Sequence, residues 1–96
     1  MKSGQGKPRA ASAALTAQYL KRILQYLQGA ALDPSVAIPL DRSLLEAGIL
    51  DSFGIVELIT FVEGEFNLDI PDDEITKENM GTLRKMANYV ALKKAA

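Results

Sequence analysis

The amino-acid sequence predicts an all-α fold: a small bundle of three main helices plus one short helix, with a long loop after the first helix. Apolar residues recur at helical spacing in three stretches, which are residues 13–28, 52–66 and 79–94. Pro34 and Pro39 interrupt helical continuity between the first two stretches, which predicts the long loop. The short alternating run at 36–40 has no partner strand, so we expect no sheet.

The chain has 96 residues, of which 48% are hydrophobic, and this is enough for one small domain with a core. We expect that domain to occupy residues 14–94 and to be a monomer. Residues 1–13 contain basic residues, glycine and alanine, and no large apolar residue after Met1. This composition predicts a flexible basic N-terminal tail.

The first helix is expected from about Ala13 to Gln28. Its buried face is a stripe with i, i+3, i+4, i+7 spacing, formed by Leu20, Ile23, Leu24 and Leu27. Gly29 follows directly, and glycine commonly ends helices in a left-handed conformation. The sequence therefore predicts that the first helix stops at Gly29.

The loop that follows is expected to run from Ala30 to Leu50 and to lie over the core. Because a structureless loop of this length is uncommon in a compact domain, we expect a short helical turn within it. Residues 41–43 would cap this turn, residues 44–47 would form it and Gly48 would close it. Four apolar side chains would then pin the loop to the bundle: Leu44, Leu45, Ile49 and Leu50.

The second helix is expected from Ser52 to Phe66, with Asp51 or Ser52 as its N-cap and Asn67 as its C-cap. Its buried stripe consists of Ile55, Leu58, Ile59, Val62 and Phe66. Ser52 precedes this stripe, so we expect its hydroxyl to be open to solvent.

The other face of the second helix is a candidate partner-binding surface. It carries Phe53, Val56, Glu57, Thr60 and Glu63. Apolar side chains rimmed by carboxylates suit the docking of a protein partner. Packing of Phe53 and Val56 beneath the preceding loop is the alternative.

A short helix is expected from Pro71 to Ile75, because proline suits the first helical position and carboxylates favour a helix N-terminus. The last helix should begin near residues 79–82 and end near residues 93–94. Its buried stripe is Leu83, Met86, Ala87 and Val90. The acidic segment 69–78 lacks the alternating ligands and central glycine of a calcium loop, so we expect no metal site.

The composition argues against an enzyme. The chain has no cysteine and no histidine, so it lacks the usual general base, the usual metal ligand and the best protein nucleophile. Ser52 in particular has no histidine to activate it. No apolar run is long enough to span a membrane, and no signal-peptide core follows the basic N-terminus, which together favour a cytoplasmic protein.

The net charge of −1 hides a strong asymmetry along the chain. Residues 41–78 carry a net charge of −9, whereas residues 1–22 carry +5 and residues 79–96 carry +4. An acidic centre repels phosphate backbones, so we expect no nucleic-acid partner. The same charge attracts basic protein surfaces, and it surrounds Ser52.

Three motifs together resemble the acyl carrier protein family. They are Leu-Leu-Glu-Ala-Gly-Ile-Leu-Asp-Ser at 44–52, Val-Glu-Leu at 56–58 and Ile-Pro-Asp at 70–72. The resemblance runs from about Thr16 to Lys93. In that family the serine after the aspartate carries a covalent 4′-phosphopantetheine arm, so the resemblance implies attachment at Ser52. It also implies that Asp51 contributes to recognition by the modifying enzyme besides capping the helix.

Two positions depart from the common pattern of that family. Phe53 stands where many members have leucine, and Gly54 stands where many fatty-acid carriers have an acidic residue. The Gly-Ile-Leu-Asp-Ser segment is more similar to discrete carriers of amino acids or specialised acyl groups.

The resemblance implies a carrier and not an enzyme: a phosphopantetheinyl transferase would load the arm, and an acyl- or aminoacyl-loading ligase would attach cargo as a thioester. Downstream acyl-transferring enzymes with basic docking surfaces would then meet the acidic face of the second helix. The alternative is an unmodified helical adaptor that binds a protein through the same face.

Overall fold

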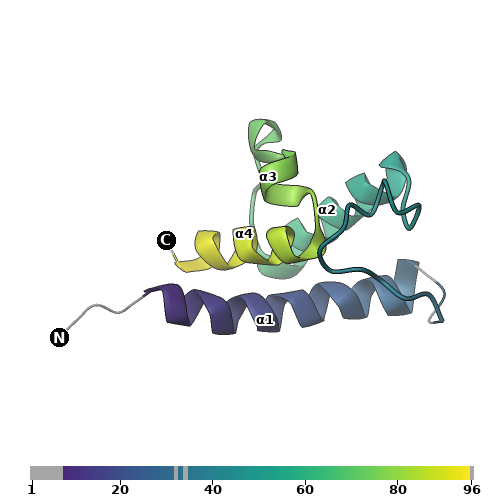
Figure 1. Cartoon of the computed structure of the whole chain (residues 1–96). Coiled ribbons are helices and arrows are strands. Elements are labelled where there is room, and N and C mark those ends of the chain that lie inside the picture. Colours follow the sequence, from purple (N-terminus) through teal and green to yellow (C-terminus); the bar gives the residue numbers. More distant parts are fainter. Residues whose placement is uncertain (1–7, 32, 34, 96) are drawn as a thin grey trace.

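A computed structural model describes residues 8–31, 33 and 35–95, and these residues form only helices, turns and irregular connections (Figure 1). In chain order, the elements are α1 (Pro8–Tyr26), the π-helix η1 (Leu27–Ala31), α2 (Ser52–Phe66), the 3₁₀ helix η2 (Asp72–Glu74), α3 (Lys77–Met80) and α4 (Leu83–Ala95). The predicted all-α class, with three main helices and a long gap after the first, is confirmed.

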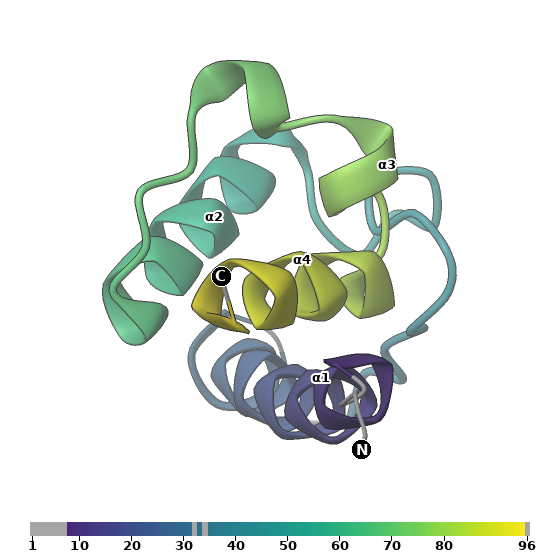
Figure 2. The ribbon, with the colours of Figure 1, turned by 90° about the vertical axis from the view of Figure 1, so that its left-hand side faces the viewer.

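Helix α4 lies at the centre of the bundle. It runs alongside α1 in the opposite direction, and α2 and α3 lie on its other side (Figures 1 and 2). Side chains from α1, η1, α2 and α4 meet in one core. The largest fully buried ones are Ile23, Leu27, Leu58, Val62, Leu83, Met86 and Val90. The predicted stripes of α2 and α4 both supply residues to this core.

Helix α1 begins at Pro8, so the expected start at Ala13 was wrong by five residues. Proline suits a first helical turn, and the alanines that follow have the highest helix propensity, although they offer no apolar stripe to recognise. Residues 1–7 lie outside the described part of the chain. The division of the chain into a tail, residues 1–13, and a domain, residues 14–94, stays a prediction.

The expected stop at Gly29 was also wrong. Helix α1 widens into the π-helix η1, which contains Gly29 and continues to Ala31. Positive φ angles occur at Gly48 and Asn67 and at no other described residue, so Gly29 does not adopt the left-handed conformation of a C-cap.

Aromatic side chains join α1 to α2. The Tyr19 and Phe66 rings meet edge to face with centroids 5.0 Å apart, and the Tyr26 and Phe61 rings stack at 4.1 Å. The Arg22 guanidinium lies 4.8 Å from the centre of the Phe66 ring. These contacts fix the second helix, and therefore its N-terminus, relative to the first.

The connection between η1 and α2 contains the predicted helical turn. Ser43 caps it, because its hydroxyl accepts a hydrogen bond from the Glu46 N–H at 3.2 Å. Gly48 closes it with a φ of 74°. Leu44 is buried as expected, and Ile49 and Leu50 are partly buried against the core. Leu45 is 49% exposed, so the expectation that it pins the loop was wrong.

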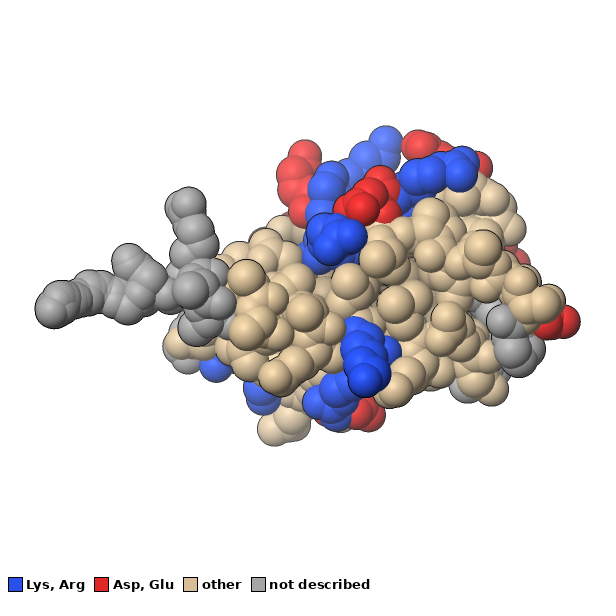
Figure 3. All heavy atoms as spheres, turned by 60° about the horizontal axis from the view of Figure 1, so that its bottom comes forward, with Lys and Arg blue, Asp and Glu red and all other residues tan. Residues whose placement is uncertain are grey.

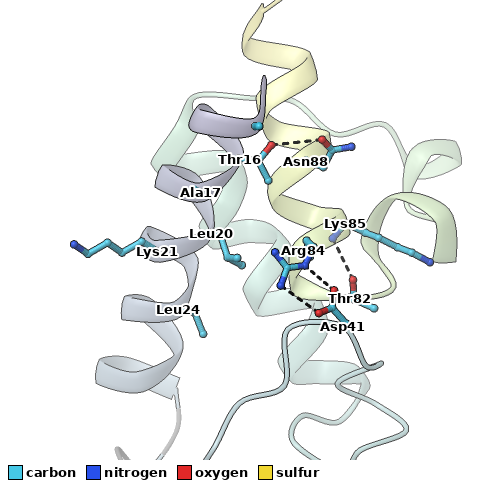
Figure 4. Close-up of a pocket in the computed structure, with 11 residues that line it drawn as sticks. Thr16, Ala17, Leu20, Lys21, Leu24, Asp41, Thr82, Arg84, Lys85 and Asn88 are labelled. Carbon is cyan, nitrogen blue, oxygen red and sulfur yellow. Dashed lines mark hydrogen bonds and ion pairs between the residues drawn. The ribbon is translucent and has the colours of Figure 1, made fainter. Parts of the chain in front are cut away.

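One ion pair ties this connection to the start of α4 (Figure 4). The Arg84 guanidinium donates to both carboxylate oxygens of Asp41, at 2.7 and 3.2 Å, and the Arg84 N–H donates to the Leu40 carbonyl at 3.1 Å. The guanidinium holds the pKa of Asp41 below its usual value. Arg84 also borders a groove of about 720 Å³ between α1 and α4, into which Leu20 and Leu24 point.

The segment between α2 and α4 differs from the single expected short helix. Pro71 precedes a 3₁₀ helix, Asp72–Glu74, and a separate four-residue helix, α3, follows. Thr76 caps α3, since its hydroxyl accepts from the Asn79 N–H at 3.2 Å. The last helix therefore begins at Leu83, just beyond the expected range.

Gly48→Ala is expected to lower the free energy of unfolding by about 1–2 kcal/mol, because an L-residue resists a positive φ. A Cβ added at Gly48 would have no atom within 4 Å, so the loss would come from the backbone alone. Denaturant unfolding measures it. Gly48→Asn should lose less, because asparagine tolerates this conformation, and an alanine variant as stable as the wild type would contradict the assignment.

Glu74 links η2 to α4, and its contribution to stability should depend on pH. The Tyr89 hydroxyl donates to its carboxylate and the Lys93 ammonium lies 3.0 Å away. Both lower the pKa of Glu74. A lowered carboxyl pKa stabilises the fold above the unfolded pKa of about 4.3, and this contribution is lost as the pH falls through the folded pKa.

Glu74→Gln should therefore be less stable than the wild type near pH 7, and the gap should close as the pH falls below about 4.3. Urea unfolding of both proteins between pH 3 and pH 7 measures this. A gap that stays constant across that range would show that the Glu74 charge contributes nothing.

Candidate functional site

Ser52 is the first residue of α2 and is exposed. The preceding residue, Asp51, is the N-cap: its backbone is extended and its Oδ1 accepts a hydrogen bond from the Gly54 N–H at 2.8 Å. The Asp51 carbonyl also accepts from the Ile55 N–H at 3.0 Å. Of the two candidate caps, Asp51 takes this role, so the Ser52 hydroxyl is not needed to begin the helix.

The chain that enters Ser52 is held from the loop side. The N–H groups of Ile49 and Leu50 both donate to the Leu44 carbonyl, at 2.9 and 3.3 Å. Leu44 itself is buried in the core. The segment before Ser52 is therefore anchored to the bundle while the serine projects at the surface.

Exposed apolar side chains lie near Ser52 in the sequence. Phe53 is 70% exposed and Val56 is 59% exposed, which answers the question of whether they pack beneath the loop. Leu45, in the turn before α2, adds a third exposed apolar side chain. Val56 lies one helical turn beyond Ser52, so the two share a side of α2.

We call the exposed surface of α2 formed by Phe53, Val56, Glu57 and Thr60 the α2 face. Glu57 and Thr60 are exposed on it, although the Thr60 hydroxyl donates to the Val56 carbonyl at 3.0 Å. Glu63 is only half-exposed, and its carboxylate accepts a hydrogen bond from the Ile70 N–H at 2.9 Å. Glu63 therefore holds the chain after α2 in place, a role that helical spacing alone could not reveal.

Two shallow grooves flank the first turns of α2. One, of about 250 Å³, lies between the loop turn at 43–46 and the segment 75–81. The other, of about 330 Å³, lies between α2 and the chain at 70–75. Ile55 and Ile75 border both grooves, so together they form the wall between them.

Charge is distributed differently on the side of the molecule formed by α1. There, Lys and Arg side chains stand among uncharged residues, with acidic residues toward the edges of the view (Figure 3). Lys21 and Arg22 belong to α1, and Arg22 pairs with Glu65 at the border with α2. Ion pairs nevertheless join the basic ends of the sequence to its acidic centre, since Arg84 pairs with Asp41 and Lys93 with Glu74.

Within the described residues, acidic side chains do not gather into a group of three or more that could hold a metal ion, including those of the segment 69–78. The helices described are also too short or too polar to cross a membrane. The site therefore consists of an exposed serine, its capping aspartate and an adjoining apolar and acidic surface.

A small helical bundle that presents a serine at the head of its second helix has the form of a carrier domain. Comparison with family models supports this class directly, because the model described as "Phosphopantetheine attachment site" matches residues 19–90. The chain belongs to this family. This membership confirms the resemblance to phosphopantetheine-bearing proteins and the predicted 4′-phosphopantetheine cofactor.

Curated relatives are named "D-alanyl carrier protein". The chain is 43% identical over 51 residues to one from Streptococcus suis (strain 98HAH33), and 39% identical over 51 residues to one from Streptococcus pyogenes serotype M5 (strain Manfredo). Each match covers 53% of this chain and 65% of the relative. The chain thus spans just under two thirds of the length of these relatives.

Proposed function

We propose that this protein is an aminoacyl carrier whose arm is attached to Ser52. The observation that carries the proposal is the exposure of Ser52 at the head of α2, next to an aspartate that performs the capping. The family match supports a 4′-phosphopantetheine arm. The names of the streptococcal relatives favour D-alanine or a similar small amino acid as cargo.

The attachment requires little of the chain itself. Ser52 Oγ would attack the phosphorus next to pantetheine in coenzyme A, forming a phosphodiester as the pyrophosphate bond breaks. Adenosine 3′,5′-bisphosphate leaves, and the hydroxyl proton passes to a base of the transferase. The absence of histidine from the chain is therefore no obstacle.

The first turn of α2 suits a phosphodiester at Ser52. Backbone N–H groups at a helix N-terminus favour nearby negative charge. The arm supplies the thiol that the chain lacks, since the sequence contains no cysteine. A ligase would activate the amino acid with ATP, releasing pyrophosphate, and would then transfer it from AMP to that thiol, releasing AMP.

Partner enzymes would dock on the α2 face beside Ser52. Phe53 and Val56 offer apolar contact area, and Glu57 offers a negative charge to a basic partner surface. Thr60 extends the same surface. Glu63 adjoins it, and its carboxylate accepts the hydrogen bond from the Ile70 N–H. Carriers meet several enzymes in turn, so a small surface with a charged rim fits weak and salt-sensitive association.

We propose three kinds of partner enzyme, a cellular compartment and an oligomeric state. They are a phosphopantetheinyl transferase, an aminoacyl-loading ligase and downstream acyl-transferring enzymes with basic docking surfaces. The protein would work in the cytoplasm, where coenzyme A and ATP are available, and as a monomer.

The test loads the arm and then the cargo. The holo protein is incubated with ATP, D-alanine and a ligase that serves a D-alanyl carrier, and its intact mass is measured before and after hydroxylamine. We expect one alanyl group that hydroxylamine removes, and none on Ser52→Ala. Loading by a fatty-acid ligase in place of the D-alanine ligase would contradict the aminoacyl cargo while leaving the carrier function in place.

An unmodified adaptor is the competing function, because the exposed side chains of the α2 face would suit it equally well. It predicts that Ser52→Ala retains all partner binding. Loss of binding only when the arm is missing would exclude it.

A further inference from the structure

Gly54 lies where the chain before α2 crosses the first turn of the helix. A Cβ added at Gly54 would lie 3.1 Å from Leu50 Cδ2, 3.3 Å from Leu50 Cβ and 3.4 Å from Asp51 Oδ1. Optimal separations between non-bonded carbons are about 3.5–4.0 Å. The Leu50 side chain thus lies closer to position 54 than a Cβ there would ordinarily allow.

Backbone conformation is not the reason for this glycine. The φ angle of Gly54 is not positive, since among the described residues only Asn67 and Gly48 have positive values. A Cβ added at Gly64, in the same helix, would have no atom within 4 Å. An alanine would therefore fit freely at Gly64 and would meet Leu50 and Asp51 at Gly54.

The two residues that approach Gly54 are the two that precede Ser52. Leu50 is held by its N–H bond to the Leu44 carbonyl and by partial burial against the core. Asp51 is held by its capping bond to the Gly54 N–H. A methyl group at Gly54 would require the Leu50 side chain or the Asp51 carboxylate to give by a few tenths of an ångström, and these two residues directly precede Ser52 in the chain.

We propose that Gly54 is a positioning residue for the modification of Ser52. By leaving room for Leu50 against the first turn, it sets where the Ser52 hydroxyl stands relative to the α2 face that the transferase contacts. This inference rests on the proposed attachment at Ser52. It assigns a role to a position where the sequence departs from the pattern of fatty-acid carriers.

The test compares Gly54→Ala with Gly64→Ala, a matched substitution in the same helix. The initial rate of phosphopantetheine transfer is measured against the concentration of the carrier, and denaturant unfolding is measured in parallel. Because a 1 Å misplacement can cost about a hundredfold in rate, a shift of a few tenths of an ångström should lower kcat for Gly54→Ala about fivefold.

KM for the carrier should change less than twofold in Gly54→Ala, because Phe53 and Val56 remain in place to dock. Gly64→Ala should keep the wild-type kcat and gain stability, since alanine is the better helix former. Equal kcat values for the two variants would overturn the proposal. So would a change in Gly54→Ala that falls entirely on KM.

A second substitution tests the contact itself. Leu50→Ala removes Cδ2, the atom nearest the added methyl group. In the Leu50→Ala background, Gly54→Ala should lower kcat less than it does in the wild type, because the closest contact is gone while the Cβ of residue 50 remains 3.3 Å away. Strictly multiplicative effects of the two substitutions would overturn the contact as the cause. If the wild type itself gains no arm, the proposed function fails, which is a different result from equal rates in all variants.

Discussion

Ser52→Ala is expected to abolish the gain of phosphopantetheine completely while changing the free energy of unfolding by less than about 0.5 kcal/mol. The loss is complete because the hydroxyl oxygen is the atom that forms the new phosphodiester. The stability is kept because Ser52 is exposed and Asp51 provides the helix cap. Intact mass after incubation with coenzyme A and a broad-specificity transferase measures the first effect, and urea unfolding measures the second.

Ser43→Ala is the matched control for that substitution. Ser43 caps the loop turn through the Glu46 N–H, so its loss should cost about 1 kcal/mol of stability but leave the modification intact. Ser52→Ala should therefore lose the modification and keep its stability, whereas Ser43→Ala should keep the modification and lose stability. Modification of Ser52→Ala, or a large loss of its stability, would contradict the assignment of Ser52 as a peripheral attachment residue.

Leu58→Ala should cause a large loss of stability, about 2–5 kcal/mol. Leu58 has no exposed surface, and its side chain lies in the core with residues of α1 and α4. Truncation removes buried apolar surface and leaves a cavity that the packed helices cannot fully close. Chemical denaturation measures the loss, and a change below about 1 kcal/mol would show that the core rearranges to fill the space.

Val56→Ala is the counterpart on the exposed side of the same helix. Val56 is 59% exposed, so its truncation should change stability by less than about 0.5 kcal/mol. It should nevertheless weaken transfer to partner enzymes, because it removes apolar surface next to Ser52. Wild-type transfer kinetics in Val56→Ala would remove Val56 from the docking surface.

Periodicity and capping chemistry predicted most of the second helix, although Ile55, which was expected in the buried stripe, is only partly buried. Its bounds, its Asn67 C-cap and four of the five residues of its buried stripe follow from local rules that operate within a few residues, whereas the choice of Asp51 over Ser52 as N-cap came from the structure. Ser52 could be placed at the helix head for the same reason. The motif that indicates a carrier also lies within this short stretch of sequence.

Other features depend on distant contacts, which a sequence pattern does not contain. Glu63 lies on the face opposite the core by spacing, but the chain after α2 returns and places the Ile70 N–H against its carboxylate. Leu45 was expected to be buried with Leu44, yet adjacent residues of one helical turn face different directions and only Leu44 reaches the core. The π-helical end of α1 and the four-residue helix α3 are too short to leave a periodic signal.

The most direct test of the account is to locate the arm in the modified chain. Cleavage after Arg42 and Lys77 releases a peptide that contains two serines, Ser43 and Ser52. Fragmentation of this peptide by tandem mass spectrometry should place a single phosphopantetheine on Ser52. A phosphopantetheine on Ser43 or elsewhere, or no addition while a control carrier is modified by the same transferase, would contradict the central claim.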